Sequence, residues 1–195
     1  MQKKDNHYKN NQNFYFNEYW KDSDGSNLYR PNGFESLPED VYMAFLVEIN
    51  KDGKVLDLGC GNGLMLKYLM TMSGYKLIPY GVDFMPPSIK QAKEILHLQH
   101  RANFTVGNVI HYSFSSKGPF DFIFVPLHHI DPADRINYLN KIKRAIKKNG
   151  KIIFYEYADS LRAERQDWIG GYQELKNWQL ERKDYPGVSI AIWKN

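Results

Sequence analysis

Four residues near position 60 have the types and the spacing of a cofactor-binding turn. Asp57 ends a short apolar stretch, and Gly59, Gly61 and Gly63 follow it at alternate positions. Glycine adopts positive φ without strain and lets a ligand approach backbone N–H and C=O groups closely. A helix over residues 64–72 would direct its N-terminus at that ligand, as in folds that bind a dinucleotide. The pattern predicts a cofactor site between a strand and a helix.

The spacing of the glycines separates two classes of cofactor. The dinucleotide motif is G-x-G-x-x-G, whereas this chain has G-x-G-x-G, with Leu64 where the third dinucleotide glycine would stand. The Asp57 carboxylate would repel a pyrophosphate, but it suits a ligand that carries ammonium and sulfonium groups. Both features favour S-adenosylmethionine (SAM) over NAD.

Residues 55–63 resemble the first motif of the class I SAM-dependent methyltransferases, with Cys60 at a variable position. Further segments resemble later motifs of this family in the same order: a strand ending at Asp83, a loop at residues 107–109, a strand at 120–125, and a helix end, glycine turn and strand at 147–153. The resemblance covers residues 55 to 157. It departs from the family pattern at Asn108, where Asp is more common.

The resemblance implies a SAM site at the carboxyl ends of the strands, where ligands of open α/β sheets bind. In that site Asp83 would accept both ribose hydroxyls, a task that suits a carboxylate. Phe84 would lie against the adenine, and Asn108 would pair with its exocyclic amine, although asparagine is also a common turn residue. The implied SAM-binding residues are Asp57, Gly59, Cys60, Gly61, Gly63, Asp83, Phe84, Asn108, Val109 and Leu127.

The loop after the strand at 120–125 contains the candidate catalytic residues, His128 and His129. Methyl transfer is an in-line displacement at a carbon that the sulfonium already activates, so the protein mainly aligns the reactants. If the acceptor is a hydroxyl, a histidine can take its proton because imidazole titrates near neutral pH. The alternative is that the two histidines only pack or cap at this junction.

Three other chemistries are not expected. Enzymes of this fold that methylate exocyclic amines of adenine, cytosine or glutamine carry Asn or Asp, two prolines and an aromatic residue where this chain has residues 125–128. Cys60 is the only cysteine, so an intrachain disulfide and a cysteine metal site are excluded, and methylation through a cysteine adduct is not expected. Asp131, Glu156 and Asp159 could approach a metal, but acids at loop ends are common and no metal is expected.

Length and composition predict one domain, because 195 residues with 43% hydrophobic content can bury a single core. Residues 37–195 form the predicted core, and residues 1–36 a predicted lid. The lid segment is rich in aromatic residues, which either close over the cofactor and shape the substrate pocket or are simply buried. The candidate lid and substrate residues are Tyr15, Tyr19, Tyr29 and Arg30.

Charge and hydropathy limit the partners of the chain. A net charge of +4 permits nucleic acid binding but does not favour it. The N-terminus lacks the apolar segment of a secretory signal, and the apolar runs are too short to span a bilayer. We therefore expect a cytoplasmic protein without a membrane partner.

The predicted elements alternate between strands and helices. Helix 132–146 is expected to bury Ile136, Leu139, Ile142 and Ile146 on one face. The last two strands, at 178–183 and 188–193, are joined by so short a link that they must be antiparallel. The fold predicted is a doubly wound α/β domain with a mostly parallel seven-stranded sheet, helices on both faces and a C-terminal antiparallel hairpin.

These observations predict a SAM-dependent methyltransferase that acts on an O or N atom of a small-molecule acceptor. Two alternatives stay open: an RNA or tRNA methyltransferase, and a non-catalytic SAM-binding sensor or partner subunit. A nicotinamide oxidoreductase is disfavoured by the glycine spacing and by the terminal hairpin. The sequence sets no oligomeric state.

Overall fold

The computed structural model describes residues 8–10, 13, 39–113, 116–163 and 165–195. The predicted lid residues Tyr15, Tyr19, Tyr29 and Arg30 lie outside this described part of the chain. Among the described residues, no helix combines the length and the hydropathy that crossing a bilayer requires.

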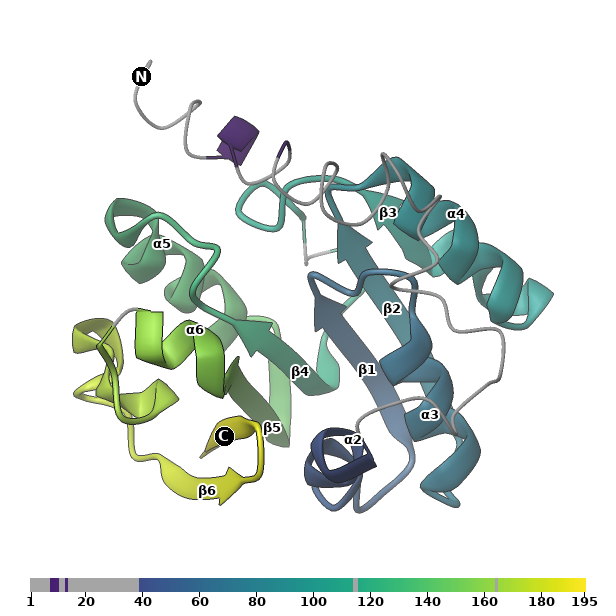
Figure 1. Cartoon of the computed structure of the whole chain (residues 1–195). Coiled ribbons are helices and arrows are strands. Elements are labelled where there is room, and N and C mark those ends of the chain that lie inside the picture. Colours follow the sequence, from purple (N-terminus) through teal and green to yellow (C-terminus); the bar gives the residue numbers. More distant parts are fainter. Residues whose placement is uncertain (1–7, 11–12, 14–38, 114–115, 164) are drawn as a thin grey trace.

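A seven-stranded sheet runs through the molecule in the order β3-β2-β1-β4-β5-β7-β6 (Figure 1). Parallel pairing joins the first five of these strands, and β7 pairs antiparallel with both β5 and β6. The predicted fold class is therefore confirmed, including the terminal hairpin and the insertion of β7 beside β5. The strands are β1 (Gly53–Leu58), β2 (Leu77–Asp83), β3 (Phe104–Val106), β4 (Phe120–Pro126), β5 (Ile146–Tyr157), β6 (Glu181–Tyr185) and β7 (Val188–Lys194).

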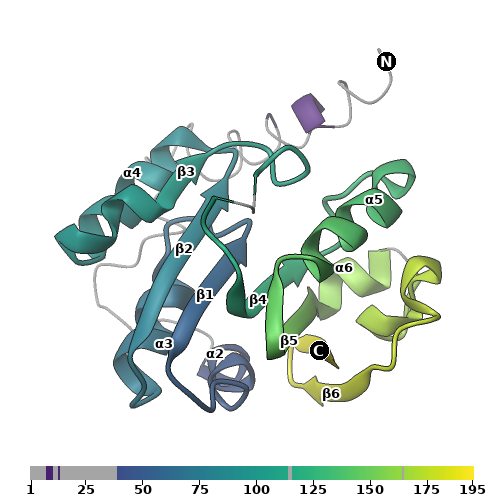
Figure 2. The ribbon, with the colours of Figure 1, turned by 180° about the vertical axis from the view of Figure 1, so that it is seen from behind.

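Helices cover both faces of the sheet, and two apolar clusters fill the layers between (Figures 1 and 2). One cluster packs α2, α3 and α4 against one face, and the other packs α5 and α6 against the opposite face. The α-helices are α2 (Glu39–Leu46), α3 (Leu64–Met72), α4 (Pro86–Ile95), α5 (Pro132–Lys143) and α6 (Ala158–Ala163), with 3-10 turns at Leu98–Asn103, Ile169–Gly171 and Gln173–Leu175.

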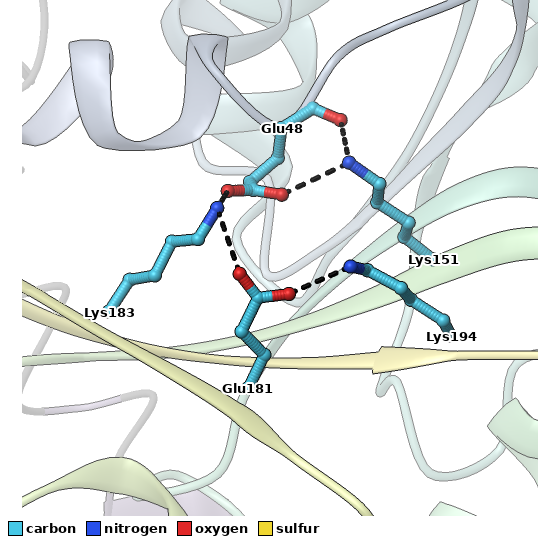
Figure 3. A network of polar contacts seen from close by, with 5 residues as sticks. All are labelled: Glu48, Lys151, Glu181, Lys183 and Lys194. Atoms are coloured by element: carbon cyan, nitrogen blue, oxygen red, sulfur yellow. Dashed lines mark hydrogen bonds and ion pairs between the residues drawn. The ribbon is translucent and has the colours of Figure 1, made fainter.

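An ion-pair network fastens the end of α2 to the C-terminal half of the sheet (Figure 3). Glu48 is 1% exposed, and its carboxylate accepts hydrogen bonds from Lys183 Nζ at 2.6 Å and Lys151 Nζ at 3.1 Å. Glu181, an exposed residue of β6, pairs with Lys183 and Lys194. The buried carboxylate thus ties one helix to β5 and β6.

The predicted face of the helix at 132–146 is wrong at two of its four residues. Ile136 is 62% exposed, and Ile146 lies in β5 instead of the helix. The buried face of α5 is formed by Arg135, Tyr138, Leu139 and Ile142, which have the spacing i, i+3, i+4, i+7. The face was misassigned because two of its members are polar or amphipathic.

The predicted helix end and glycine turn at 147–150 are also wrong, because β5 already begins at Ile146. Ile146 pairs with Phe120, whereas Lys151 pairs with Phe122, so the pairing register shifts between these positions. Asn149 takes φ 60 inside this irregularity. Residues 147–150 therefore form a bulge at the start of a strand.

Candidate cofactor and active site

The glycine turn leaves the carboxyl end of β1 and enters α3 with its backbone in the left-handed region. Gly59, Gly61 and Gly63 have φ values of 86, 51 and 75. The amides of Gly59 and Cys60 both donate to the Val82 carbonyl, at 2.8 and 3.1 Å, which fixes the turn to β2. Residues with a Cβ seldom adopt this conformation, so the shape of the turn depends on glycine.

Asp83 ends β2 and holds the turn from the other side. Its Oδ2 accepts a hydrogen bond from the Gly61 amide at 2.9 Å, and its Oδ1 accepts one from the Met85 amide at 2.8 Å. Burial raises the pKa of the Asp83 carboxyl, and the two amides act in the opposite direction. Each oxygen keeps a second lone pair, so both can accept hydrogen bonds from the hydroxyl groups of a ligand.

Asp57 is the last residue but one of β1 and is only 2% exposed. Its Oδ1 is buried without a hydrogen-bond partner among the described residues. Burial, and then the neighbouring negative charge of Asp83, raises the pKa of Asp57 to about 8. A buried carboxyl that lacks a cation of its own suits a ligand that brings positive charge.

Two adjoining cavities open along the carboxyl edge of the strands, with volumes of about 480 and 440 Å³. Gly59, Asp83, Phe84, Pro126 and His129 line both cavities, so they form one crevice. The larger cavity extends over the loop after β3 and is also lined by Tyr8, Lys9, Asn108, Val109 and His111. The smaller cavity extends over the glycine turn and α2 and is also lined by Tyr42, Phe45, Asp57, Cys60, Gly61, His128, Tyr155 and Tyr157.

The loop after β4 places both predicted histidines at the smaller cavity. His128 Nδ1 lies 2.6 Å from Glu156 Oε2, and the His128 backbone amide donates to the same oxygen at 3.1 Å. The imidazole rings of His128 and His129 are adjacent, with centroids 3.3 Å apart. A histidine with one ring nitrogen held by a carboxylate has the arrangement of a general base.

Most of the residues predicted to bind SAM come together at this crevice, and two do not. Leu127 is fully buried and lines neither cavity. Gly63 also lines neither cavity, since a Cβ there would meet Ala92 Cβ at 3.2 Å and it packs against α4. Asn108 lines the larger cavity, while its Oδ1 accepts a hydrogen bond from the Ile110 amide at 3.0 Å and so also forms a turn.

Sequence reasoning missed Glu156 as the partner of His128, and it also missed Tyr8. Glu156 is 0% exposed, although it was considered only as an acid at a loop end. Tyr8 donates a hydrogen bond to Asp134 at the start of α5, at 3.0 Å. The signal for Glu156 was present, because it is an acid close to the end of an apolar strand, as Asp57 and Asp83 are.

Comparison with known proteins agrees with this architecture. The family described as a methyltransferase domain matches residues 55–150. The N-methyltransferase NodS from Bradyrhizobium japonicum WM9, in complex with S-adenosyl-L-homocysteine, has 14% identity and a TM-score of 0.65 over 97% of this chain and 98% of that chain. No curated protein sequence matches the chain.

Two other solved structures share the fold with different activities in their names. A protein from Nostoc punctiforme PCC 73102 assigned to the O-methyltransferases has 18% identity and a TM-score of 0.64. The match covers 80% of this chain and 56% of that chain. An RNA methyltransferase from Salinibacter ruber, in complex with S-adenosyl-L-homocysteine, has 14% identity and a TM-score of 0.57 over 81% of this chain and 92% of that chain. Identities this low show the fold alone.

The fold and the crevice define a Rossmann-like domain with a crevice at the carboxyl ends of its parallel strands, where open α/β sheets bind ligands. The motif order and the family match identify which branch of such domains this is. Residues 55–150 form a methyltransferase domain, and the order of its motifs and strands is that of the class I SAM-dependent methyltransferases.

Proposed function

We propose that the chain transfers a methyl group from SAM to an O or N atom of a small-molecule acceptor. The observation that carries the proposal is the buried Asp57 carboxyl: Asp57 lines the smaller cavity, and its Oδ1 has no hydrogen-bond partner among the described residues. A SAM molecule brings the positive charge that this carboxyl lacks. The adjoining cavities have the size of small-ligand pockets, in which a cofactor and a modest acceptor fit together.

In this proposal the larger cavity takes the adenosine part of SAM. Asp83 accepts the ribose hydroxyls, since it lines both cavities and each carboxylate oxygen retains a lone pair. Phe84 and Val109 provide apolar contact for the adenine, and Asn108 provides an amide at its edge. Bound SAM supplies a methyl group on a sulfonium sulfur. Gly59 and Gly61 let the backbone approach the methionine part beside Asp57.

The acceptor then enters the smaller cavity, where His128 and His129 are the candidate bases. Residues 1–36, with Tyr15, Tyr19, Tyr29 and Arg30, remain the proposed lid over this site. A cavity of about 440 Å³ lined by side chains of the core favours a small acceptor over RNA.

The test is titration calorimetry with SAM and with NAD on the wild type, on Asp83→Asn, and on Asp167→Asn as a control at an exposed aspartate. We expect SAM to bind and NAD not to bind. Asp83→Asn should weaken SAM binding by about 10- to 100-fold, because hydrogen bonds to a charged group contribute roughly 1.5–3 kcal/mol. Asp167→Asn should bind like the wild type.

Two results would contradict the proposal: preferential binding of NAD, or SAM binding that Asp83→Asn leaves unchanged. SAM binding without methyl transfer to any small molecule would favour the non-catalytic sensor. Tight and strongly salt-dependent binding of RNA, with methyl transfer to it, would favour the RNA methyltransferase.

A further inference from the structure

Glu156 is the most deeply buried ionisable side chain at the active site, and its carboxylate is surrounded by donors. Its exposed fraction is 0%. Oε2 accepts from the His128 amide at 3.1 Å and lies 2.6 Å from His128 Nδ1. Oε1 accepts from the Tyr157 amide at 3.1 Å. Both oxygens of Glu156 are therefore used as hydrogen-bond acceptors.

This arrangement selects one tautomer of His128. Backbone N–H groups can only donate, and one of them donates to each Glu156 oxygen, an arrangement that an ionised carboxylate satisfies fully. An ionised carboxylate next to Nδ1 requires that Nδ1 carry the ring proton. His128 Nε2 then holds a lone pair and can act as a base.

Four aromatic side chains form part of the lining of the smaller cavity. Tyr42 and Phe45 come from α2, and Tyr155 and Tyr157 from β5. The rings of Phe45 and Tyr155 meet edge to face at 5.0 Å between centroids, and those of Tyr155 and Tyr157 at 6.0 Å. None of the described lining residues of this cavity is a lysine or an arginine. An uncharged, planar acceptor fits this wall better than an anionic one.

We propose that Glu156 is a positioning residue that holds His128 with Nε2 free to deprotonate the hydroxyl group of a phenol-like acceptor. This inference rests on the proposed function and names its acceptor class. His128 Nε2 takes the hydroxyl proton, and the acceptor oxygen forms a bond to the methyl carbon. The bond from that carbon to sulfur breaks, and its electron pair stays on sulfur. The products are a methyl ether, S-adenosyl-L-homocysteine and a protonated His128.

The first test reads the tautomer of His128 directly, without any acceptor. Nitrogen-15 NMR of the imidazole groups, with S-adenosyl-L-homocysteine added, should show a protonated Nδ1 and an unprotonated Nε2 for His128 in the wild type. Glu156→Gln should lose this tautomer preference, because either orientation of the amide places an NH₂ group against a backbone N–H. Glu181→Gln, at an exposed carboxylate of β6, is the matched control and should leave the His128 signals unchanged.

The second test measures methyl transfer to phenol and to aniline as probes. We expect transfer to phenol, with kcat lowered at least 10-fold in Glu156→Gln and about 100-fold in His128→Asn. The SAM dissociation constant should stay within about 2-fold of the wild type in both variants. A 2-fold change is smaller than the effect of losing one typical hydrogen bond to SAM. His128→Asn keeps a side-chain N–H for Glu156, so it preserves the fold if Glu156→Gln does not.

The outcomes separate this inference from the proposed function. Failure to bind SAM in calorimetry overturns both. SAM binding with transfer to aniline alone, or to neither probe, overturns only the phenol-like acceptor. An unchanged His128 tautomer in Glu156→Gln, or an unchanged kcat in both variants, overturns the positioning role of Glu156.

Discussion

Asp57→Asn tests whether the buried carboxyl that lines the smaller cavity is unfavourable to ionise in the ligand-free protein. The folded protein raises the pKa of Asp57 from 3.8 to about 8, first by burial and then through the charge of Asp83. A carboxyl whose pKa is higher in the folded state binds its proton more tightly there. The stability it contributes is complete below pH 4 and is lost as the pH rises towards 8.

The size of this effect follows from the linkage between proton binding and folding. Within the window between the two pKa values, the free energy of unfolding of the ligand-free protein should fall by about 1.4 kcal/mol per pH unit through this one group. The total loss across the window is on the order of 5 kcal/mol. Asparagine has nearly the same volume but does not titrate, so Asp57→Asn should lack this loss.

The assay is urea unfolding of the wild type and Asp57→Asn at pH 5, 6, 7 and 8. The difference in unfolding free energy, wild type minus Asp57→Asn, isolates Asp57 because the other titrating groups are common to both proteins. We expect this difference to fall steadily with rising pH, whereas the same difference for Asp167→Asn should stay flat. If the difference in unfolding free energy between the wild type and Asp57→Asn stays constant from pH 5 to pH 8, the reasoning is refuted.

Two further predictions concern stability. Gly81→Ala should lower the free energy of unfolding in urea by roughly 1–3 kcal/mol, because a Cβ there would lie 2.5 Å from the Phe104 ring and 2.6 Å from Cys60 Sγ. Its control is Gly107→Ala, which should be close to neutral because a Cβ there would have no atom within 4 Å. Equal losses in the two variants would contradict this prediction. Glu48→Gln, at the centre of the network in Figure 3, should lose about 3 kcal/mol because the carboxylate is buried between two lysines. Its control, Glu181→Gln, should lose less than about 1 kcal/mol in the same measurement, and a larger loss at Glu181 than at Glu48 would reject the assignment.

The sequence was sufficient where a short local pattern decides the structure. The glycine turn, the helix at 64–72 and the strand ending at Asp83 lie where they were predicted. A link of two residues, Pro186 and Gly187, leaves the last two strands no other pairing than antiparallel. These elements can be predicted from the local sequence, without knowing which distant residues they contact.

The predictions were wrong where contacts with residues far away in the sequence determine the local structure. Residues 147–150 read as a turn after a helix, but the pairing of Ile146 with Phe120 draws them into β5 as a bulge. In α5, Arg135 is 7% exposed because its guanidinium lies over the Tyr172 ring and its Nε donates to the Ile130 carbonyl. No helical periodicity of apolar residues can identify a buried arginine whose partners lie outside the helix.

The same limit explains why three acids with one sequence pattern have three different roles. Asp57, Asp83 and Glu156 all lie at or near the carboxyl end of an apolar strand and are all at most 7% exposed. Asp83 is held by two backbone amides, and Glu156 by two amides and His128, so both are already paired before any ligand arrives. Asp57 alone of the three keeps a buried oxygen without a partner among the described residues. A cationic ligand would supply the charge that Asp57 lacks, whereas a ligand such as NAD, which brings a pyrophosphate, would add to the repulsion from Asp83.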